Sequence, residues 1–157
     1  MGTLTALIDG LASGAIDVID LTAPLSAETP IIQLPPEFGQ TDRFALEEIS
    51  RYDDRGPAWY WNNFRSGEHT GTHFDAPVHW ITGKDLPNNA CDTIEPRRFV
   101  GPACVIDITR EVEANPDYLL TPQDLERWEK TNGRVPKNAW VLLRTGWSKR
   151  KTAKEFL

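Results

Sequence analysis

The sequence has little of what marks exported, membrane-bound or nucleic-acid-binding proteins. It holds two cysteines, Cys91 and Cys104, too few for a disulfide framework. No apolar run approaches the roughly 20 residues of a membrane-spanning helix, and the first residues lack the basic start of a secretory signal. The net charge is −6 with a pI near 5.1, which disfavours nucleic acid and anionic membranes as partners. These absences predict a cytoplasmic protein with reduced thiols that acts on small molecules.

Histidine is also scarce, but its three copies are concentrated in one segment. They are His69, His73 and His79, and with Asp75 they form the pattern H-x3-H-x-D-x3-H. Imidazole nitrogen and carboxylate oxygen are the usual protein ligands of Zn2+, Mn2+ and Fe2+. Two histidines and one aspartate leave coordination positions open for water and substrate, as in catalytic metal sites. The pattern therefore predicts a site for a divalent metal ion.

We expect this segment to be extended rather than helical. Gly71 and Pro77 both disfavour a helix. In an extended chain alternate side chains share one face, so His69, His73 and Asp75 would point the same way. Beyond Pro77 the alternation is interrupted, and it does not fix the direction of the last histidine.

Nucleophilic catalysis is the alternative use of these residues. Ser66 could serve as a nucleophile, with a histidine as base and Asp75 as the group that orients it. No Gly-x-Ser-x-Gly elbow surrounds any serine in the sequence, and neither cysteine has an activating context. The metal site is therefore the stronger interpretation.

The rest of the chain predicts a single α/β or α+β domain over residues 1–157. A helix is expected from Thr121, which can cap it, through Pro122 and Asp124 in its first turn, to Gly133. The apolar run 139–143 is typical of a strand buried on both faces. Apolar spacing predicts the other elements, a helix over 3–20 and strands over 18–21, 59–64 and 104–108.

The segment His69–His79 resembles the H-x-G-T-H-x-D-x-P-x-H signature of the metal-dependent cyclase-like hydrolases, a family that includes bacterial kynurenine formamidases and isatin hydrolases. The similarity extends to 18–22, 92–94, 105–107 and 142–147. The resemblance implies a cyclase-like swivelling β/β/α domain, with a mixed central sheet or partial barrel flanked by helices. It also implies a homo-oligomer such as a homodimer.

The resemblance further assigns roles to the four residues of the pattern. It implies that His69, His73 and Asp75 bind the metal, and that His79 is a general acid/base or the ligand of a second ion. Either Mn2+ or Zn2+ suits these ligands, and the sequence does not choose between them. Family members continue past the segment 142–147 and add polar residues to the site. We therefore expect this chain to lack the C-terminal part of that site.

Aromatic residues near the histidines suggest a flat aromatic substrate. The predicted substrate-binding residues are Trp59, Trp61, Phe64 and Trp80, and they make the chain resemble isatin hydrolases more than short formamidases. The expected reaction is hydrolysis of a small cyclic aromatic amide by metal-activated water. Three alternatives remain open: an arylformamidase acting on N-formylkynurenine, a metal-binding fragment or degenerate member without turnover, and a carrier domain that uses the aromatic groove alone.

Overall fold

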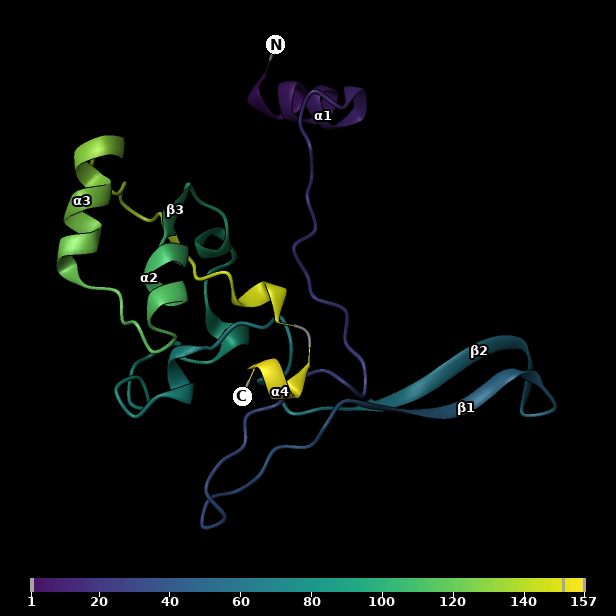
Figure 1. Cartoon of the computed structure of the whole chain (residues 1–157). Helices are drawn as coiled ribbons and strands as arrows, with labels where there is room; N and C mark the ends of the chain where they lie inside the picture. The colour runs from purple at the N-terminus through teal and green to yellow at the C-terminus, as the bar shows by residue number, and fades with distance from the viewer. Residues whose placement is uncertain (1, 151, 157) are drawn as a thin grey trace.

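The computed structural model describes residues 2–150 and 152–156 as a mixed α/β structure with two small sheets (Figure 1). Helices and strands are joined by long irregular segments, and most helices are short. In chain order the elements are α1 (Thr3–Ser13), β1 (Ala45–Asp53), β2 (Gly56–Arg65), η1 (Pro77–His79), η2 (Cys91–Thr93), η3 (Pro96–Phe99), β3 (Ala103–Asp107), α2 (Thr109–Ala114), α3 (Pro122–Asn132), β4 (Trp140–Arg144), η4 (Trp147–Lys149) and α4 (Ala153–Phe156).

The first sheet is the antiparallel hairpin of β1 and β2. It pairs Ala45 with Arg65 at its base and Asp53 with Gly56 at its tip. The register shifts within β1, once between Glu48 and Ser50, which marks a bulge on that strand. The hairpin projects away from the helices as a two-stranded arm (Figure 1). The strand predicted over 59–64 is confirmed as part of β2.

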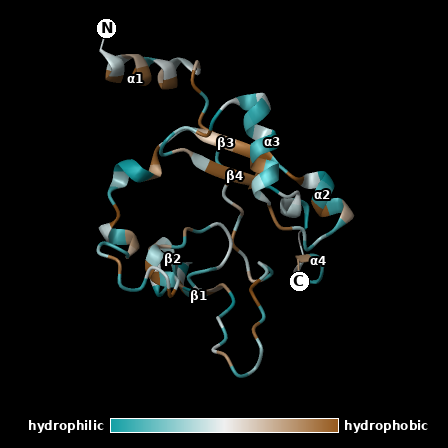
Figure 2. Cartoon of the chain, turned by 90° about the vertical axis from the view of Figure 1, so that its left-hand side faces the viewer, coloured by the Kyte–Doolittle hydropathy of each residue, from teal (hydrophilic) through white to brown (hydrophobic). Residues whose placement is uncertain are grey.

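The second sheet pairs β3 with β4 in parallel and carries the apolar core of the chain. Ile106, Ile108 and Val112 are buried together. Tyr118 and Leu125 lie partly buried against them, and α2 and α3 stand beside the two apolar strands in Figure 2. The strand expected over 104–108 is therefore confirmed as β3.

Both ends of α3 follow the local sequence signals. The hydroxyl of Thr121 accepts a hydrogen bond from the Asp124 backbone at 3.3 Å, and the Asp124 carboxylate accepts one from the Thr121 backbone at 2.8 Å. This reciprocal pair is a capping box, and Gly133 ends the helix. The carboxylate is buried and accepts further hydrogen bonds from Thr121 and Tyr118. These bonds lower the pKa of Asp124 to about 2.

Three expectations are wrong. The first helix stops at Ser13 instead of residue 20, because Gly14 takes a left-handed conformation with φ +72°. The segment 18–21 is extended but is not a strand, since it pairs with no strand in the described ranges. Residues 140–144 do form β4, but all five are exposed, so the predicted burial on both faces does not occur.

Two further expectations concern thiols and membranes. Cys91 and Cys104 are both free, the first exposed and the second buried in β3. Among the residues that the structure describes, no helix is both long and apolar enough to cross a bilayer.

Candidate metal centre

The segment that carries the histidines is a series of turns, not an extended strand. Residues 68–72 form turns and bends, and Pro77–His79 form the short 3-10 helix η1. Gly71 lies in the left-handed region at φ +68°, and a Cβ at this position would be 2.5 Å from a methyl group of Leu25. We predicted that an extended chain would place His69, His73 and Asp75 on one face by alternation. That prediction is wrong, because the chain bends at Gly71.

Contacts with distant residues hold this segment in place. The backbone N–H of Ala23 donates to the hydroxyl of Thr72 at 2.9 Å. The N–H of Val78 donates to the carbonyl of Asn89 at 3.0 Å. The Asn89 side chain in turn donates to the carbonyls of Gly83 and Lys84, which closes the loop behind η1. The site is thus positioned by tertiary contacts more than by regular secondary structure.

The structure brings His69, His73 and His79 together around Asp75. One carboxylate oxygen lies 2.7 Å from Nδ1 of His69 and 3.2 Å from Nε2 of His73. The rings of His69 and His79 lie 3.9 Å apart between centroids. Ligand atoms of His69, Asp75 and His79 all lie within 4.8 Å of one another, so these three alone could hold a metal ion. His79 therefore belongs to this group of potential ligands, whereas the predicted ligand His73 is not part of it.

The hydrogen bonding of His73 fits a cation at this point. Its Nδ1 lies 2.8 Å from the carbonyl oxygen of Gly71. A carbonyl only accepts, so Nδ1 carries the proton and a neutral His73 has its lone pair on Nε2. That lone pair faces the Asp75 carboxylate, an arrangement that is favourable when a proton or a metal ion lies between them. The nitrogen and oxygen donors present thus suit a divalent cation.

Asp75 is held in its charged form. Partial desolvation raises the pKa of its carboxyl group, but the hydrogen bond from His69 and the neighbouring imidazoles outweigh this and bring the pKa below the ordinary value. The side chains of His69 and Asp75 remain about one-third exposed, at 31% and 35%. A carboxylate that stays ionised and open to solvent is available to a cation at neutral pH.

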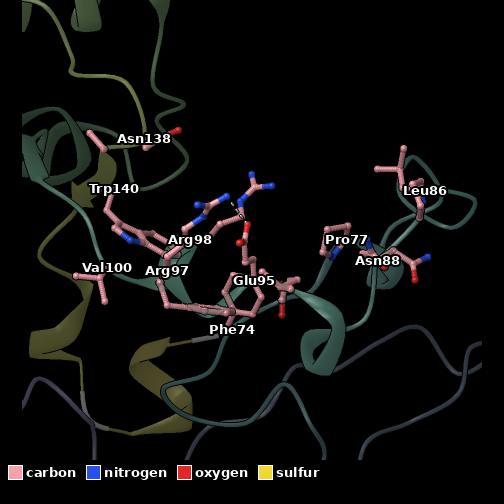
Figure 3. Close-up of a pocket in the computed structure, with 16 residues that line it drawn as sticks. Phe74, Pro77, Leu86, Asn88, Glu95, Arg97, Arg98, Val100, Asn138 and Trp140 are labelled. Atoms are coloured by element: carbon pink, nitrogen blue, oxygen red, sulfur yellow. Dashed lines mark ion pairs between the residues drawn. The ribbon is translucent and has the colours of Figure 1, made fainter.

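Two open cavities meet the histidine segment. One, of about 750 Å³, is lined by His69 and His73 and by residues 23–32. The other, of about 870 Å³, has Phe74 and Asp75 on one wall and Trp140 on another; Figure 3 shows Phe74 and Trp140 with the Glu95–Arg97 ion pair among its lining residues. The cluster therefore forms part of the wall of both cavities.

Sequence reasoning missed one group that lines the first cavity. Arg150 belongs to the basic end of the chain, which is most simply a solvated tail in sequence. In the structure its guanidinium lies 3.9 Å from the ring centre of Trp147, and both residues line the cavity with the histidines. The spacing of three residues between them was the available signal, since it places side chains on one face of a helical turn.

The four predicted aromatic residues are not brought together. Trp80 is beside the cluster, with its ring 4.6 Å from that of His79. Trp59, Trp61 and Phe64 lie on β2 in the projecting hairpin, and alternation places Trp61 and Phe64 on opposite faces, with Phe64 near Phe44. None of the four is among the residues that line the two cavities. Their role in substrate binding stays a prediction.

Comparisons with known proteins find chains similar to this one. An isatin hydrolase of Roseibium aggregatum is 45% identical over 148 residues, which are 94% of this chain and 56% of the relative. The solved structure of isatin hydrolase A from Ralstonia solanacearum matches with a TM-score of 0.95 and 57% identity, over 100% of this chain and 60% of that one. An isatin hydrolase bound to the product analogue thioisatinate matches with a TM-score of 0.94 and 43% identity, over 100% of this chain and 62% of that one.

These matches also show how much of each relative this chain covers. The chain spans between 56% and 62% of the length of these three proteins. Its fold is the cyclase-like α+β fold of the isatin hydrolase structures. The family model described as "Putative cyclase" matches residues 19–157, nearly the whole chain. The chain therefore belongs to the cyclase family, as the histidine signature predicted.

Proposed function

We propose that this chain carries the metal-binding part of a hydrolase that opens the amide ring of a small, flat, isatin-like aromatic substrate. The observation that carries the proposal is that one Asp75 oxygen lies 2.7 Å from Nδ1 of His69 and 3.2 Å from Nε2 of His73, with His79 beside them. The similarity to proteins named isatin hydrolases supports the choice of a cyclic amide over N-formylkynurenine.

Three residues are proposed to hold the ion. His69 and His73 offer ring nitrogens and Asp75 an ionised carboxylate, a donor set that suits Mn2+ or Zn2+. When bound, such an ion supplies Lewis-acid polarisation of water and of the scissile carbonyl. The Gly71 carbonyl orients His73 through its Nδ1 and leaves Nε2 for the ion.

His79 is proposed as the proton carrier. It lies at the edge of the cluster, against His69 on one side and Trp80 on the other. From there it takes a proton from the attacking water and returns it to the amide nitrogen as the C–N bond breaks. The products of this hydrolysis are a carboxylate and an aryl amine on one ring. His79 is also close enough to bind a second ion, which is the competing role.

The predicted aromatic pocket depends on a homo-oligomer. Trp59 and Trp61 stand on a hairpin that projects from the rest of the chain (Figure 1), with half of each side chain exposed, at 50% and 54%. We propose that this arm reaches the histidine cluster of another copy, so that substrate stacking by Trp59, Trp61 and Phe64 takes place between copies, whereas Trp80 acts within its own chain.

The test measures metal binding and turnover separately. The purified chain is loaded with Mn2+ or Zn2+, its metal content is determined by elemental analysis, and the hydrolysis of isatin and of N-formylkynurenine is followed by absorbance. We expect bound metal in wild type, loss of metal in His73→Ala, and retained metal with reduced isatin opening in His79→Ala. Hydrolysis of N-formylkynurenine alone would replace the proposed substrate. Metal bound without any turnover would restrict the function of this chain to binding.

A further inference from the structure

The cavity of about 750 Å³ beside the metal cluster carries one permanent cation. Its volume lies in the range of pockets that enclose a small ligand. His69 and His73 form part of the wall, and Pro30 and Ile31 add apolar surface. Among the described residues that line it, Arg150 is the only lysine or arginine. The cavity therefore combines the proposed metal ligands, apolar surface and a positive charge.

The guanidinium of Arg150 is held in place by two contacts. It lies 3.9 Å from the ring centre of Trp147, and its Nη1 donates to the backbone carbonyl of Glu155 at 3.2 Å. Trp147 is itself partly buried against the apolar core around Ile108. A charged group that is already held in one position loses less conformational entropy when a ligand binds to it.

No acidic side chain neutralises Arg150 within the described part of the chain. Glu28 lines the same cavity but forms no ion pair with it. The contact with Glu155 goes through a backbone carbonyl, and the carboxylate of that residue accepts hydrogen bonds from Thr152. A guanidinium has five N–H donors in a planar fork that fits a carboxylate. Arg150 thus has a charge and donors to offer to an anion.

The proposed reaction produces such an anion. The substrate is a neutral cyclic amide. On hydrolysis, water supplies the second oxygen of a carboxylate, one proton goes to the nitrogen as the C–N bond breaks, and the other proton goes to solvent. Negative charge therefore appears at the reacting carbonyl, and a fixed cation in a largely apolar cavity stabilises this charged group more than the neutral amide. Only such a difference raises the rate of the chemical step.

We propose that Arg150 binds the carboxylate that forms in this cavity and so orients the aromatic ring with respect to the metal cluster. The segment of Arg150 belongs to the shared fold, because the structure of isatin hydrolase A matches 100% of this chain with a TM-score of 0.95. The reaction named here rests on the proposed function. Binding of an aromatic carboxylate by Arg150 does not require turnover, and it can be measured separately.

Titration of the metal-free chain with anthranilate tests this binding. Anthranilate is fluorescent and carries a carboxylate and an amine on one aromatic ring, the groups of the proposed product. We expect saturable 1:1 binding by wild type and at least about tenfold weaker binding by Arg150→Gln, the usual effect of losing a hydrogen-bonded charge. The control is Arg110→Gln, at an exposed arginine of α2 that lines neither cavity, and it should bind like wild type. Absence of binding by wild type, or equal binding by Arg150→Gln, would overturn the proposal.

A neutral probe separates the charge of Arg150 from its structural contacts. Benzamide has the same ring without the anion, so its weak binding should be equal in wild type and Arg150→Gln. If benzamide and anthranilate lost the same affinity, the variant would have changed the shape of the cavity, which contradicts the proposal. Arg150→Lys covers the case in which the glutamine variant does not fold. It keeps the cation but not the planar fork, so anthranilate affinity should fall between those of wild type and Arg150→Gln, with benzamide unaffected.

Kinetics of the metal-loaded chain give a third measurement. With isatin as substrate, Arg150→Gln should lower kcat and leave KM nearly unchanged, because the neutral substrate gains little from the cation. A rise in KM with kcat unchanged would show that Arg150 binds the substrate rather than the developing carboxylate. Retained anthranilate binding in a chain without turnover would contradict the proposed function and leave the role of Arg150 in carboxylate binding intact.

Discussion

The segment 104–133 and the segment 69–79 are held together in different ways. In the first, regular helices and strands pack on an apolar core: Asp124 caps the helix that begins two residues before it, and the Trp128 indole N–H of that helix donates to the Val105 carbonyl of β3 at 2.8 Å. In the second there is little regular structure. The Thr72 hydroxyl accepts a hydrogen bond from the Ala23 backbone, 49 residues away, and Leu25 leaves no room for a Cβ at Gly71.

This contrast explains why the metal cluster can be both well defined and easily disturbed. The core around Ile108 excludes water and is stabilised by apolar burial. The cluster around Asp75 is solvent-accessible and depends on contacts that other parts of the chain make at single atoms. Loss of a core side chain should therefore unfold the chain, whereas loss of a cluster side chain should remove a ligand and leave the fold intact.

His73→Ala should produce the largest functional loss. It removes a donor atom next to Asp75, and we expect divalent-metal affinity to fall by at least ~100-fold, more than the loss of an orienting group usually costs. Isothermal titration with Mn2+ and Zn2+ measures the affinity. The unfolding temperature of the metal-free variant should equal that of the metal-free wild type. Unchanged metal content in the variant would rule out His73 as a ligand.

Ile108→Ala should show the opposite pattern. Ile108 is 2% exposed and sits at the centre of the core, so its truncation should lower the free energy of unfolding by about 2–5 kcal/mol. Leu119→Ala is the control, because Leu119 is largely exposed and its loss should change little. Urea denaturation measures both. Under conditions where the variant is folded, its metal affinity should equal that of wild type. A loss of metal affinity in the folded variant would show that the core and the metal cluster are not independent.

The difference between local contacts and contacts from distant residues also explains which features could be predicted from the sequence. α3 was predictable at both ends because Thr121, Asp124 and Gly133 act within their own neighbourhood. The sequence predicted that His69, His73 and Asp75 converge, and their donor atoms do lie together, whereas the direction of His79 was left open. The reason given for the convergence was wrong, since an extended strand was expected where Gly71 makes a turn. Leu25 also leaves no room there for a Cβ, a long-range restriction that local propensity does not encode.

The exposure of β4 could not be predicted for a related reason. An apolar run such as 140–144 reports how a strand is buried in the complete fold, and the described residues supply one neighbouring strand on one side. The lining of the histidine cavity by Arg150 was missed because a basic tail looks solvated in sequence. The exposure of β4 and the position of Arg150 both depend on which segments, distant in the sequence, pack against them in the fold.

Gly71→Ala should have a smaller effect that is specific to the site. Alanine in a left-handed conformation costs about 1–2 kcal/mol, and here its Cβ would also displace Leu25. The matched control is Gly146→Ala, since Gly146 is left-handed at φ +79° but meets only a methyl group of Thr109 at 3.4 Å. Both should lose stability in chemical denaturation, Gly71→Ala more than Gly146→Ala, because only the Cβ at Gly71 meets an atom too close to accommodate it. Only Gly71→Ala should also lose metal affinity, and an equal loss in both would mean that Leu25 does not position the cluster.

Thr121→Ala should cost about 1 kcal/mol, the usual value of a lost N-cap. The variant removes the hydroxyl that accepts from the Asp124 backbone and leaves the metal cluster untouched. Thermal unfolding monitored by circular dichroism measures the loss. Thr152→Ala provides a control, since that threonine lies at the start of the short helix α4, apart from the core. A decrease in metal affinity in Thr121→Ala would show that α3 and the cluster are coupled after all.

The charge of Asp124 should make the stability of the chain depend on pH. Its pKa in the folded chain is about 2, below the ordinary value near 3.8, because the Thr121 backbone and side chain and the Tyr118 hydroxyl donate to the ionised form. A lowered folded pKa gives stability that is present above the unfolded pKa and lost as pH falls through the folded one. The stability difference between wild type and Asp124→Asn should therefore be constant from pH 7 to 5 and shrink below about pH 4. A difference that already shrinks between pH 7 and 5 would show that another titrating group controls this cap.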